Sequence, residues 1–285
     1  MQDKETYRIG IVLTNFMSYT PSGILEEISK VFREQGHITL YTETNGNLED
    51  ERKAISYLVE ETDGLIIMSC AKDYSEIEDV LPDSFPAVFL LSYPRNCRKS
   101  VIIENDYSAI YQGILSLSNQ NFRKIACVIE NPDTLVGQSY IKAYEDALNA
   151  IGQPIEKNMM IEIDDFTSMN PTKIFSQIIA CGAEAVFCTS SALTVSLSDC
   201  LIYYNHNINN KPIPLLGYGV SDVSIASFLS VDLISHSVAE FANLAFQTLI
   251  YCIRHPNETV QKERVLQLKG TLQIHKYNGL NITED

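Results

Sequence analysis

The hydrophobic residues of this chain alternate between short apolar runs and longer helical repeats. Residues 8–13 form a mostly apolar, β-branched run, the pattern of a strand that is buried on both faces. A polar, aromatic stretch follows at residues 14–20, and Pro21 and Ser22 are typical of a helix start. Apolar residues then recur at helical spacing up to Gly36. In doubly wound sheets ligands bind beyond the carboxyl ends of the strands, so the loop before Pro21 is the first candidate binding site.

The same strand-and-helix alternation continues and then restarts after residue 105. In the first part we expect further strands at 38–42, 64–68, 87–91 and 101–103, with helices at 47–61 and 74–81. In the second part we expect strands at 124–129, 159–163, 185–189, 214–217, 233–234 and 270–276, with helices at 107–119, 136–151, 171–181, 192–205, 222–229 and 238–254. This order predicts an α/β fold of two doubly wound parallel-sheet lobes.

Composition places the chain among globular proteins. Hydrophobic residues make up 45% and charged residues 20% of its 285 positions. No apolar run approaches the roughly 20 residues that a membrane span needs, and residues 1–5 lack the apolar core of a signal peptide. Seven cysteines without regular spacing indicate reduced, buried thiols. We therefore expect a cytoplasmic protein with no membrane contact.

Charge and motifs argue against several classes of function. The formal net charge of −15 disfavours binding to a nucleic-acid backbone, which needs clustered Lys and Arg. The sequence has no G-x-S-x-G elbow and no P-loop, and its five histidines show no metal-ligand spacing. We therefore expect no catalytic residues, no metal and no cofactor, and a protein that is not an enzyme.

Several segments, taken in their order, carry a family resemblance over about residues 8–276. They are YRIGIVLTNF at 7–16, ETDGLIIMS at 61–69, VIIENDYSAIYQGILSLSNQNFRKIACV at 101–128, GQSYIKAYEDAL at 137–148, AVFCTSSALTVSLSDCL at 185–201 and PLLGYGVSDVSIASFLSVDLISHSVAEFANLAF at 214–246. Together they resemble the effector-binding core of the LacI/GalR (lactose-repressor/galactose-repressor) family of bacterial transcription regulators.

The resemblance implies a periplasmic-binding-protein type I fold, with two lobes joined by three crossovers. The N-terminal lobe would comprise residues 7–105 plus 236–263 and the C-terminal lobe 106–235 plus 264–280, with tails at 1–6 and 281–285. In this family a small molecule, often a sugar, binds in the interlobe cleft and controls DNA binding through lobe closure. Family members begin with a basic helix-turn-helix, and nothing before Tyr7 could form one. Any contact with DNA would therefore need a helix-turn-helix that is not present in this chain.

The resemblance also indicates ligand-facing positions, at which this sequence departs from the family. Tyr140 stands where the family has an Arg, Ser190-Ser191 where it has Asn-Asp, Gly219 where it has the Asp of its GYD motif, and His236 where it has a Gln. The pocket that remains would be aromatic and hydroxyl-lined, which suits a sugar or another flat ligand. The predicted ligand-binding residues are Phe16, Tyr19, Tyr93, Tyr140, Phe166, Ser190, Ser191, Tyr218 and His236.

Structural interpretations of the same residues stay open. Tyr140 could pack in a core, Ser190 and Ser191 could simply cap the helix that follows them, and His236 could be a hinge residue. The fold also serves exported solute-binding receptors of transporters, as well as some enzymes, so it does not by itself choose the function.

We also expect a homodimer. The family pairs with two-fold symmetry. Two helices, the one that contains Ile24, Leu25 and Ile28 and the one at 222–229, carry more apolar positions than a single sheet face could cover.

Overall fold

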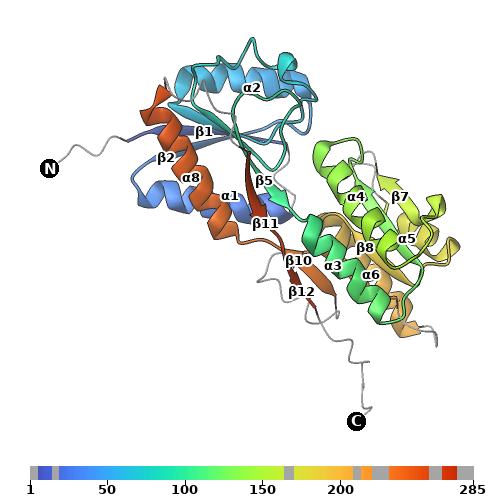
Figure 1. Cartoon of the computed structure of the whole chain (residues 1–285). Helices are drawn as coiled ribbons and strands as arrows, with labels where there is room; N and C mark the ends of the chain where they lie inside the picture. The colour runs from blue at the N-terminus through green and yellow to red at the C-terminus, as the bar shows by residue number, and fades with distance from the viewer. Residues whose placement is uncertain are drawn as a thin grey trace. The chain divides into compact units, whose positions relative to one another are not determined.

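The chain folds into two compact units, each built from discontinuous stretches of sequence (Figure 1). Unit 1 comprises Met1–Glu104 and Ser237–Leu268, and unit 2 comprises Asn105–His236 and Lys269–Asp285. The chain therefore passes from one unit to the other after Glu104, after His236 and after Leu268. The computed structural model describes residues 6–14, 19–163, 170–207, 213–219, 231–256 and 265–274.

Unit 1 contains a six-stranded sheet in the order β11-β5-β4-β3-β1-β2. The pairs from β2 through β1, β3 and β4 to β5 are parallel, as predicted. The strands are β1 (Arg8–Leu13), β2 (Ile38–Glu43), β3 (Gly64–Ile67), β4 (Ala87–Leu90), β5 (Ser100–Asn105) and β11 (Val265–Lys269). The helices are α1 (Tyr19–Glu34), α2 (Leu48–Glu61), α8 (Val238–Arg254) and the 3-10 helix η1 (Tyr74–Glu76).

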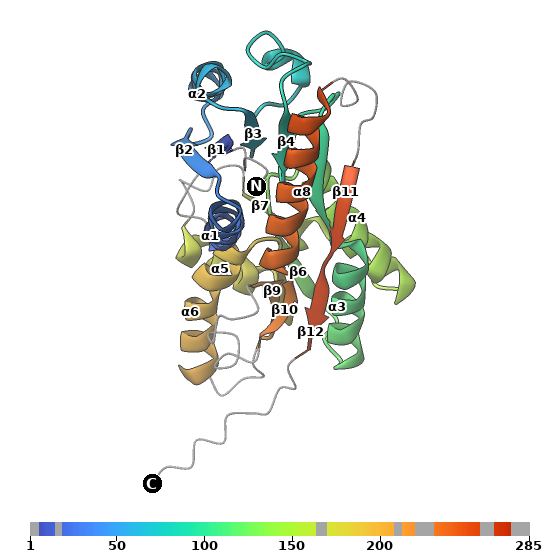
Figure 2. The same cartoon turned by 90° about the vertical axis from the view of Figure 1, so that its left-hand side faces the viewer.

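Both faces of the unit 1 sheet are covered, which explains its continuous apolar strands. On one face, Ile9 and Ile11 of β1 pack with α1 and α8, which lie side by side there (Figure 2). On the other face, Val12 of β1 packs with Ile55 and Leu58 of α2. Burial on both faces confirms the prediction that residues 8–13 form an interior strand.

Helix α1 differs from its prediction in two respects. It begins at Tyr19, so this residue lies in the first helical turn and not in the predicted loop. Ile24, Leu25 and Ile28 are 1%, 5% and 0% exposed because they pack against α8, which the sequence places more than 200 residues later. This helix therefore does not supply the exposed apolar face from which a homodimer was argued. The second helix of that argument, at 222–229, lies outside the described residues.

The helix predicted at 74–81 is reduced to η1, and side chains account for its shortness. Asp73 accepts hydrogen bonds from the backbone and hydroxyl of Ser75, while the Glu76 carboxylate accepts from the backbone nitrogens of Lys72 and Asp73. These local bonds form a capping box around a single turn, and such bonds compete with helix continuation. Turns follow as far as Val80.

Lys99 is a buried cation, only 7% exposed, that ties a loop of unit 1 together. Its Nζ donates to the carbonyl oxygens of Pro82, Asp83 and Phe85 at 2.9, 2.7 and 2.9 Å. Burial lowers the pKa of the ammonium group to about 8. One side chain therefore binds three backbone acceptors of this loop.

Replacing Lys99 with methionine should lower the free energy of unfolding by about 2–4 kcal/mol, because three carbonyl oxygens lose a hydrogen bond from a buried ammonium group. The advantage of the wild type should grow as the pH rises from about 8 toward 10.5, since the folded pKa lies below that of the unfolded chain. Urea unfolding at several pH values measures both effects. Lys53→Met is the control, because the Lys53 side chain is 66% exposed and its replacement should change stability by less than about 0.5 kcal/mol. Equal losses of unfolding free energy in Lys99→Met and Lys53→Met would contradict the stabilising role of Lys99.

Unit 2 contains the second six-stranded sheet, in the order β12-β10-β9-β8-β6-β7. Its pairs are parallel except β10 with β12, which is antiparallel. The strands are β6 (Ile125–Glu130), β7 (Met160–Ile163), β8 (Ala185–Cys188), β9 (Leu215–Tyr218), β10 (Asp232–Ser235) and β12 (Thr271–Gln273). The helices are α3 (Tyr107–Asn119), α4 (Leu135–Ala150), α5 (Pro171–Ala180), α6 (Ser191–Asn207) and the 3-10 helix η2 (Lys157–Met159).

Helices also cover both faces of the unit 2 sheet. Ile114 of α3 and Tyr144 of α4 pack on one face, while Ile178 of α5 and Leu197 of α6 pack on the other. Figure 1 shows α3 and α4 in green and α5 and α6 in yellow. The predicted α/β class with two mostly parallel sheets is confirmed.

The end of the described chain differs from the single predicted strand at 270–276. Two strands occur there: β11 belongs to the sheet of unit 1 and β12 to that of unit 2, with Gly270 between them. In the described part of the chain, no helix combines the length and apolarity needed to cross a bilayer.

Candidate functional site

The carboxyl ends of four neighbouring parallel strands define one edge of the unit 2 sheet. β6 ends at Glu130, Thr189 follows β8, β9 ends at Tyr218, and His236 comes directly after β10. The parallel register places Val128 opposite Cys188 and Tyr218 opposite Ile234, so these ends lie along the same edge. Ligands of doubly wound sheets bind at this edge.

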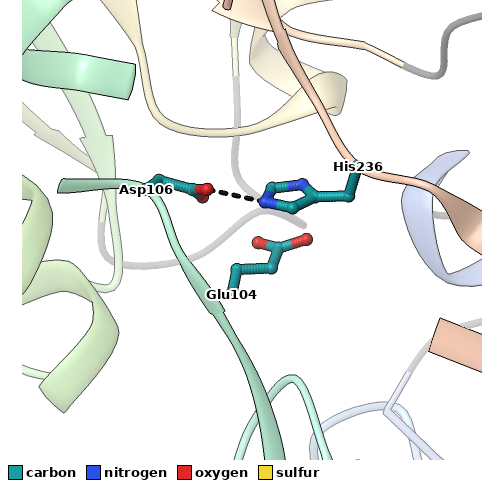
Figure 3. Close-up of side chains that lie close together, drawn as sticks. All are labelled: Glu104, Asp106 and His236. Atoms are coloured by element: carbon teal, nitrogen blue, oxygen red, sulfur yellow. Dashed lines mark hydrogen bonds and ion pairs between the residues drawn. The ribbon is translucent and has the colours of Figure 1, made fainter. Parts of the chain in front are cut away.

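Asp106 is the centre of a buried hydrogen-bond network at this site. It is 1% exposed and occupies the N-cap position of α3, yet its side chain makes no capping bond. Its Oδ2 instead accepts from the hydroxyls of Tyr140 at 3.1 Å and Tyr218 at 2.9 Å. Its Oδ1 lies 2.6 Å from Nε2 of His236, and Figure 3 shows the carboxylate and the ring facing one another. One carboxylate therefore binds three aromatic side chains from α4, from β9 and from the residue after β10.

The rings themselves form a continuous aromatic group. The centroids of Tyr140 and Tyr218 are 5.6 Å apart with planes tilted by 31°, and those of Tyr218 and His236 are 6.5 Å apart and nearly parallel. Gly270 lies against this group, because a Cβ there would be 2.3 Å from Oδ1 of Asp106. A residue with a side chain would not fit at position 270 without displacing the carboxylate.

Three of the predicted ligand-binding residues are thus brought together, namely Tyr140, Tyr218 and His236. Tyr140 and Tyr218 are each only 6% exposed and belong to a core cluster of unit 2, so their packing role is substantial. Whether they also contact a ligand stays a prediction.

Ser190 caps α6, since its Oγ accepts from the backbone nitrogen of Leu193 at 3.1 Å. Ser191 begins that helix and is buried. These positions bear out the capping interpretation and leave a ligand contact untested.

The remaining predicted residues do not join this group within unit 2. Tyr93 belongs to unit 1, where it is half-buried beside the α2 core, and burial raises the pKa of its hydroxyl. Tyr19 is described only by its helical backbone, and Phe16 and Phe166 lie outside the described residues.

Two acidic residues of the site were missed from sequence. Asp106 stands between a strand and a helix, a position at which Asp commonly serves to form a turn or to cap the helix. Glu130 ends the buried strand β6, and its Oε1 is buried without a hydrogen-bond partner in the part of the chain that the structure describes. Burial raises the pKa of Glu130, against a hydrogen bond with Ser190 that lowers it. For Glu130, the signal in the sequence was a charged residue at the last position of an apolar run.

No family model matches the chain. Among curated relatives, the ribose operon repressor of Haemophilus influenzae is 23% identical over 279 residues, covering 96% of this chain and 81% of that protein. The transcriptional repressor PurR of Photobacterium profundum is 20% identical, with 95% and 81% covered. Relatives across nearly the whole chain are therefore transcription repressors.

Solved structures show the same fold. The transcription regulator CcpA of Lactococcus lactis gives a TM-score of 0.81 at 13% identity, covering 95% of this chain and 98% of that one. The Cra regulator of Pseudomonas putida, solved with fructose 1-phosphate, gives 0.79 at 18% identity, with 94% and 98% covered. A LacI family regulator of Enterococcus faecium with bound ribose gives 0.75 at 16% identity, with 94% and 97% covered. The predicted resemblance to LacI-type effector-binding cores is confirmed.

Proposed function

We propose that this chain is the effector-sensing part of a bacterial transcription regulator and binds a sugar-like small molecule at the carboxyl edge of the unit 2 sheet. The observation that carries the proposal is the Asp106 network, which gathers Tyr140, Tyr218 and His236 at that edge. The names of the relatives and the sugars in two similar structures support the same function.

The network is suited to hold a ring-shaped ligand in a fixed orientation. Aromatic faces stack on sugar rings, and Asp106 holds two of these rings through their hydroxyls. Side chains that are fixed before the ligand arrives lose less conformational freedom on binding. Asp106 therefore acts as a positioning residue in this proposal, with the rings as the contact surface.

The positions of the network also suit a regulator. Asp106 follows the first passage of the chain between units by two residues, His236 immediately precedes the second, and Gly270 follows the third by two residues. A ligand that contacts the rings would therefore act on residues beside all three connections. It can shift a conformational equilibrium only as far as it binds one state better than another.

DNA binding and a homodimer belong to the same proposal. Contact with DNA would be made by a helix-turn-helix outside this chain, since the net charge of −15 disfavours phosphate binding by these residues. Ile38 and Leu40 on the edge strand β2 are 51% and 37% exposed, which leaves apolar surface for a second copy.

The test is ligand binding by thermal shift, followed by calorimetry on the chain and its variants. We expect at least one small molecule from a panel of ribose, fructose, fructose 1-phosphate, purines and amino acids to raise the melting temperature. Tyr218→Phe keeps the ring but removes the bond to Asp106, so it should weaken binding of that molecule roughly tenfold. Tyr203→Phe is the control, because Tyr203 is 74% exposed on α6.

Two outcomes would contradict the proposal. The first is no saturable binding by any molecule of the panel. The second is chemical conversion of a bound molecule, which would indicate an enzyme with this fold.

A further inference from the structure

Three side chains of the kinds that bind metal ions lie close together near the first passage of the chain between the units. They are Glu104, Asp106 and His236, and Figure 3 draws them. One ligand atom from each, a carboxylate oxygen or a ring nitrogen, lies within 4.8 Å of the other two. The expectation of no metal was based on spacing along the chain, which could not reveal this group because His236 lies 130 residues after Asp106.

Short-range connections bring these side chains together. Glu104 and Asn105 are the last residues of β5, so only Asn105 separates Glu104 from Asp106. His236 comes directly after β10, which pairs with β9 and β12 in the sheet of unit 2, and its ring contacts Asp106. The arrangement therefore depends on two near neighbours in sequence and on one contact inside unit 2.

Hydrogen bonds orient Asp106 as they orient carboxylates that bind metals. Its Oδ2 accepts from the hydroxyls of Tyr140 at 3.1 Å and Tyr218 at 2.9 Å, whereas its Oδ1 lies 2.6 Å from Nε2 of His236. Partners outside the coordination shell commonly hold a metal-binding carboxylate in this way. An ion bound to Oδ1 would therefore leave both tyrosine bonds in place.

The pair is buried, and one side of it is kept free of a side chain. The side chains of Asp106 and His236 are 0% and 7% exposed. A Cβ at Gly270 would lie 2.3 Å from Oδ1 of Asp106 and 3.1 Å from Nε2 of His236, so any larger residue would crowd both ligand atoms. Glu104 is only half-buried, which gives an ion a route from solvent.

The ligand atoms need only small movements to bind an ion. Two ligands of a tetrahedral zinc ion, each at ~2.0–2.2 Å from the metal, are about 3.4 Å from one another. The contact between Asp106 and His236 would lengthen from 2.6 Å as the ion replaces the proton between them, and ligand atoms up to 4.8 Å apart would approach. Both changes are on the order of an ångström.

We propose that Glu104, Asp106 and His236 bind a divalent transition-metal ion such as Zn²⁺. One imidazole nitrogen and two carboxylate oxygens form a ligand set that suits zinc, and three protein ligands leave the fourth position of the tetrahedron to water. The ion would restrain residues beside the first two passages of the chain between the units. This inference does not depend on the proposed effector.

Calorimetric titration of the untagged 285-residue chain with ZnCl₂ tests the proposal. We expect one ion to bind per chain and to raise the melting temperature by mass action. Glu104→Gln keeps the shape of the side chain but removes a ligand, so it should weaken Zn²⁺ binding at least about tenfold. His236→Ala should weaken it by at least as much. If His236→Ala does not fold, Glu104→Gln decides.

Matched variants control for binding elsewhere on the chain. Glu49→Gln removes a carboxylate that is 69% exposed, and His255→Ala removes an exposed imidazole. Both should leave Zn²⁺ affinity unchanged. Cys70, Cys181 and Cys200 are half-buried thiols that also bind zinc, so the titration is repeated after alkylation of accessible cysteines, and the affinity should persist.

The outcomes separate this site from the proposed function. No Zn²⁺ binding, or an affinity that Glu104→Gln leaves unchanged, overturns the metal site. Loss of binding after alkylation would assign the ion to cysteines and overturns it as well. Effector binding is measured separately in buffer that contains a chelator, so failure of the metal site leaves the effector-sensing function standing, and absence of effector binding leaves the metal site standing.

Discussion

Replacing Asp106 with alanine should lower the free energy of unfolding of unit 2 by about 4 kcal/mol, because three buried groups lose their common acceptor. Replacement with asparagine should cost only about 1 kcal/mol. Both tyrosine hydroxyls donate to the same oxygen, Oδ2, which the amide oxygen of asparagine can replace. The amide nitrogen would then face His236, whose ring nitrogen can accept in its other tautomer.

Urea unfolding of the wild type and both variants measures this difference. Asp79→Ala is the control for loss of an exposed carboxylate, since the Asp79 side chain is 61% exposed in its ion pair with Arg52. It should change stability far less than Asp106→Ala, because solvent screens an exposed ion pair. Equal costs for the alanine and asparagine variants of Asp106 would show that the shared acceptor oxygen does not matter.

Gly270→Ala should destabilise the protein by about 2–3 kcal/mol through overpacking. The new Cβ would lie 2.3 Å from Oδ1 of Asp106, 3.0 Å from Cγ2 of Ile234 and 3.1 Å from Nε2 of His236. These neighbours are buried or bound in the network, so relief requires moving the carboxylate or the backbone beside the third passage between units.

Gly23→Ala provides the control for a glycine replacement. Gly23 lies in α1, where an added Cβ would meet only Cγ1 of Val238 at 3.8 Å, an ordinary contact. Alanine favours the helix there, so stability should stay equal or rise by about 0.5–1 kcal/mol. Thermal melts of Gly270→Ala and Gly23→Ala, compared with the wild type, measure both effects. A Gly270→Ala protein as stable as the wild type would mean that the residues around Asp106 can move to accommodate the added Cβ.

Elements with strong local signals were predictable from the sequence. Strand β1 and helix α8 have the bounds that their apolar patterns gave, and the Ser237 side chain caps α8 by accepting from the nitrogen of Glu240. Strand β11 was missed because its short, alternating VLQLK pattern is a weak local signal. It forms a strand by pairing with β5, its neighbour in a sheet that is built mostly from the first hundred residues. Local pattern therefore determined the elements, and long-range pairing determined the sheet edges.

In the candidate site, too, local contacts could be predicted from the sequence and long-range contacts could not. The Ser190 cap is bonded to a residue three positions away, and spacing alone suggested it. The partners of Asp106 lie 34, 112 and 130 residues from it, at Tyr140, Tyr218 and His236, and no periodicity connects such positions. From sequence, Tyr140→Ala would be expected to leave the fold intact. Because Tyr140 is buried and bonded, Tyr140→Phe is the cleaner test of ligand binding.

The discontinuous units have a consequence for how the protein is made. The first 104 residues leave the ribosome early, but their sheet then lacks β11 and the covering helix α8, whose Phe241, Ala242 and Ala245 are fully or nearly fully buried in the finished unit. N-terminal domains usually fold first during synthesis, yet unit 1 cannot complete its core and its sheet until α8 and β11 have been translated. Nascent chains of this protein therefore carry an apolar sheet face that only α1 covers for most of their synthesis, and we expect protection by a chaperone to matter most in that interval.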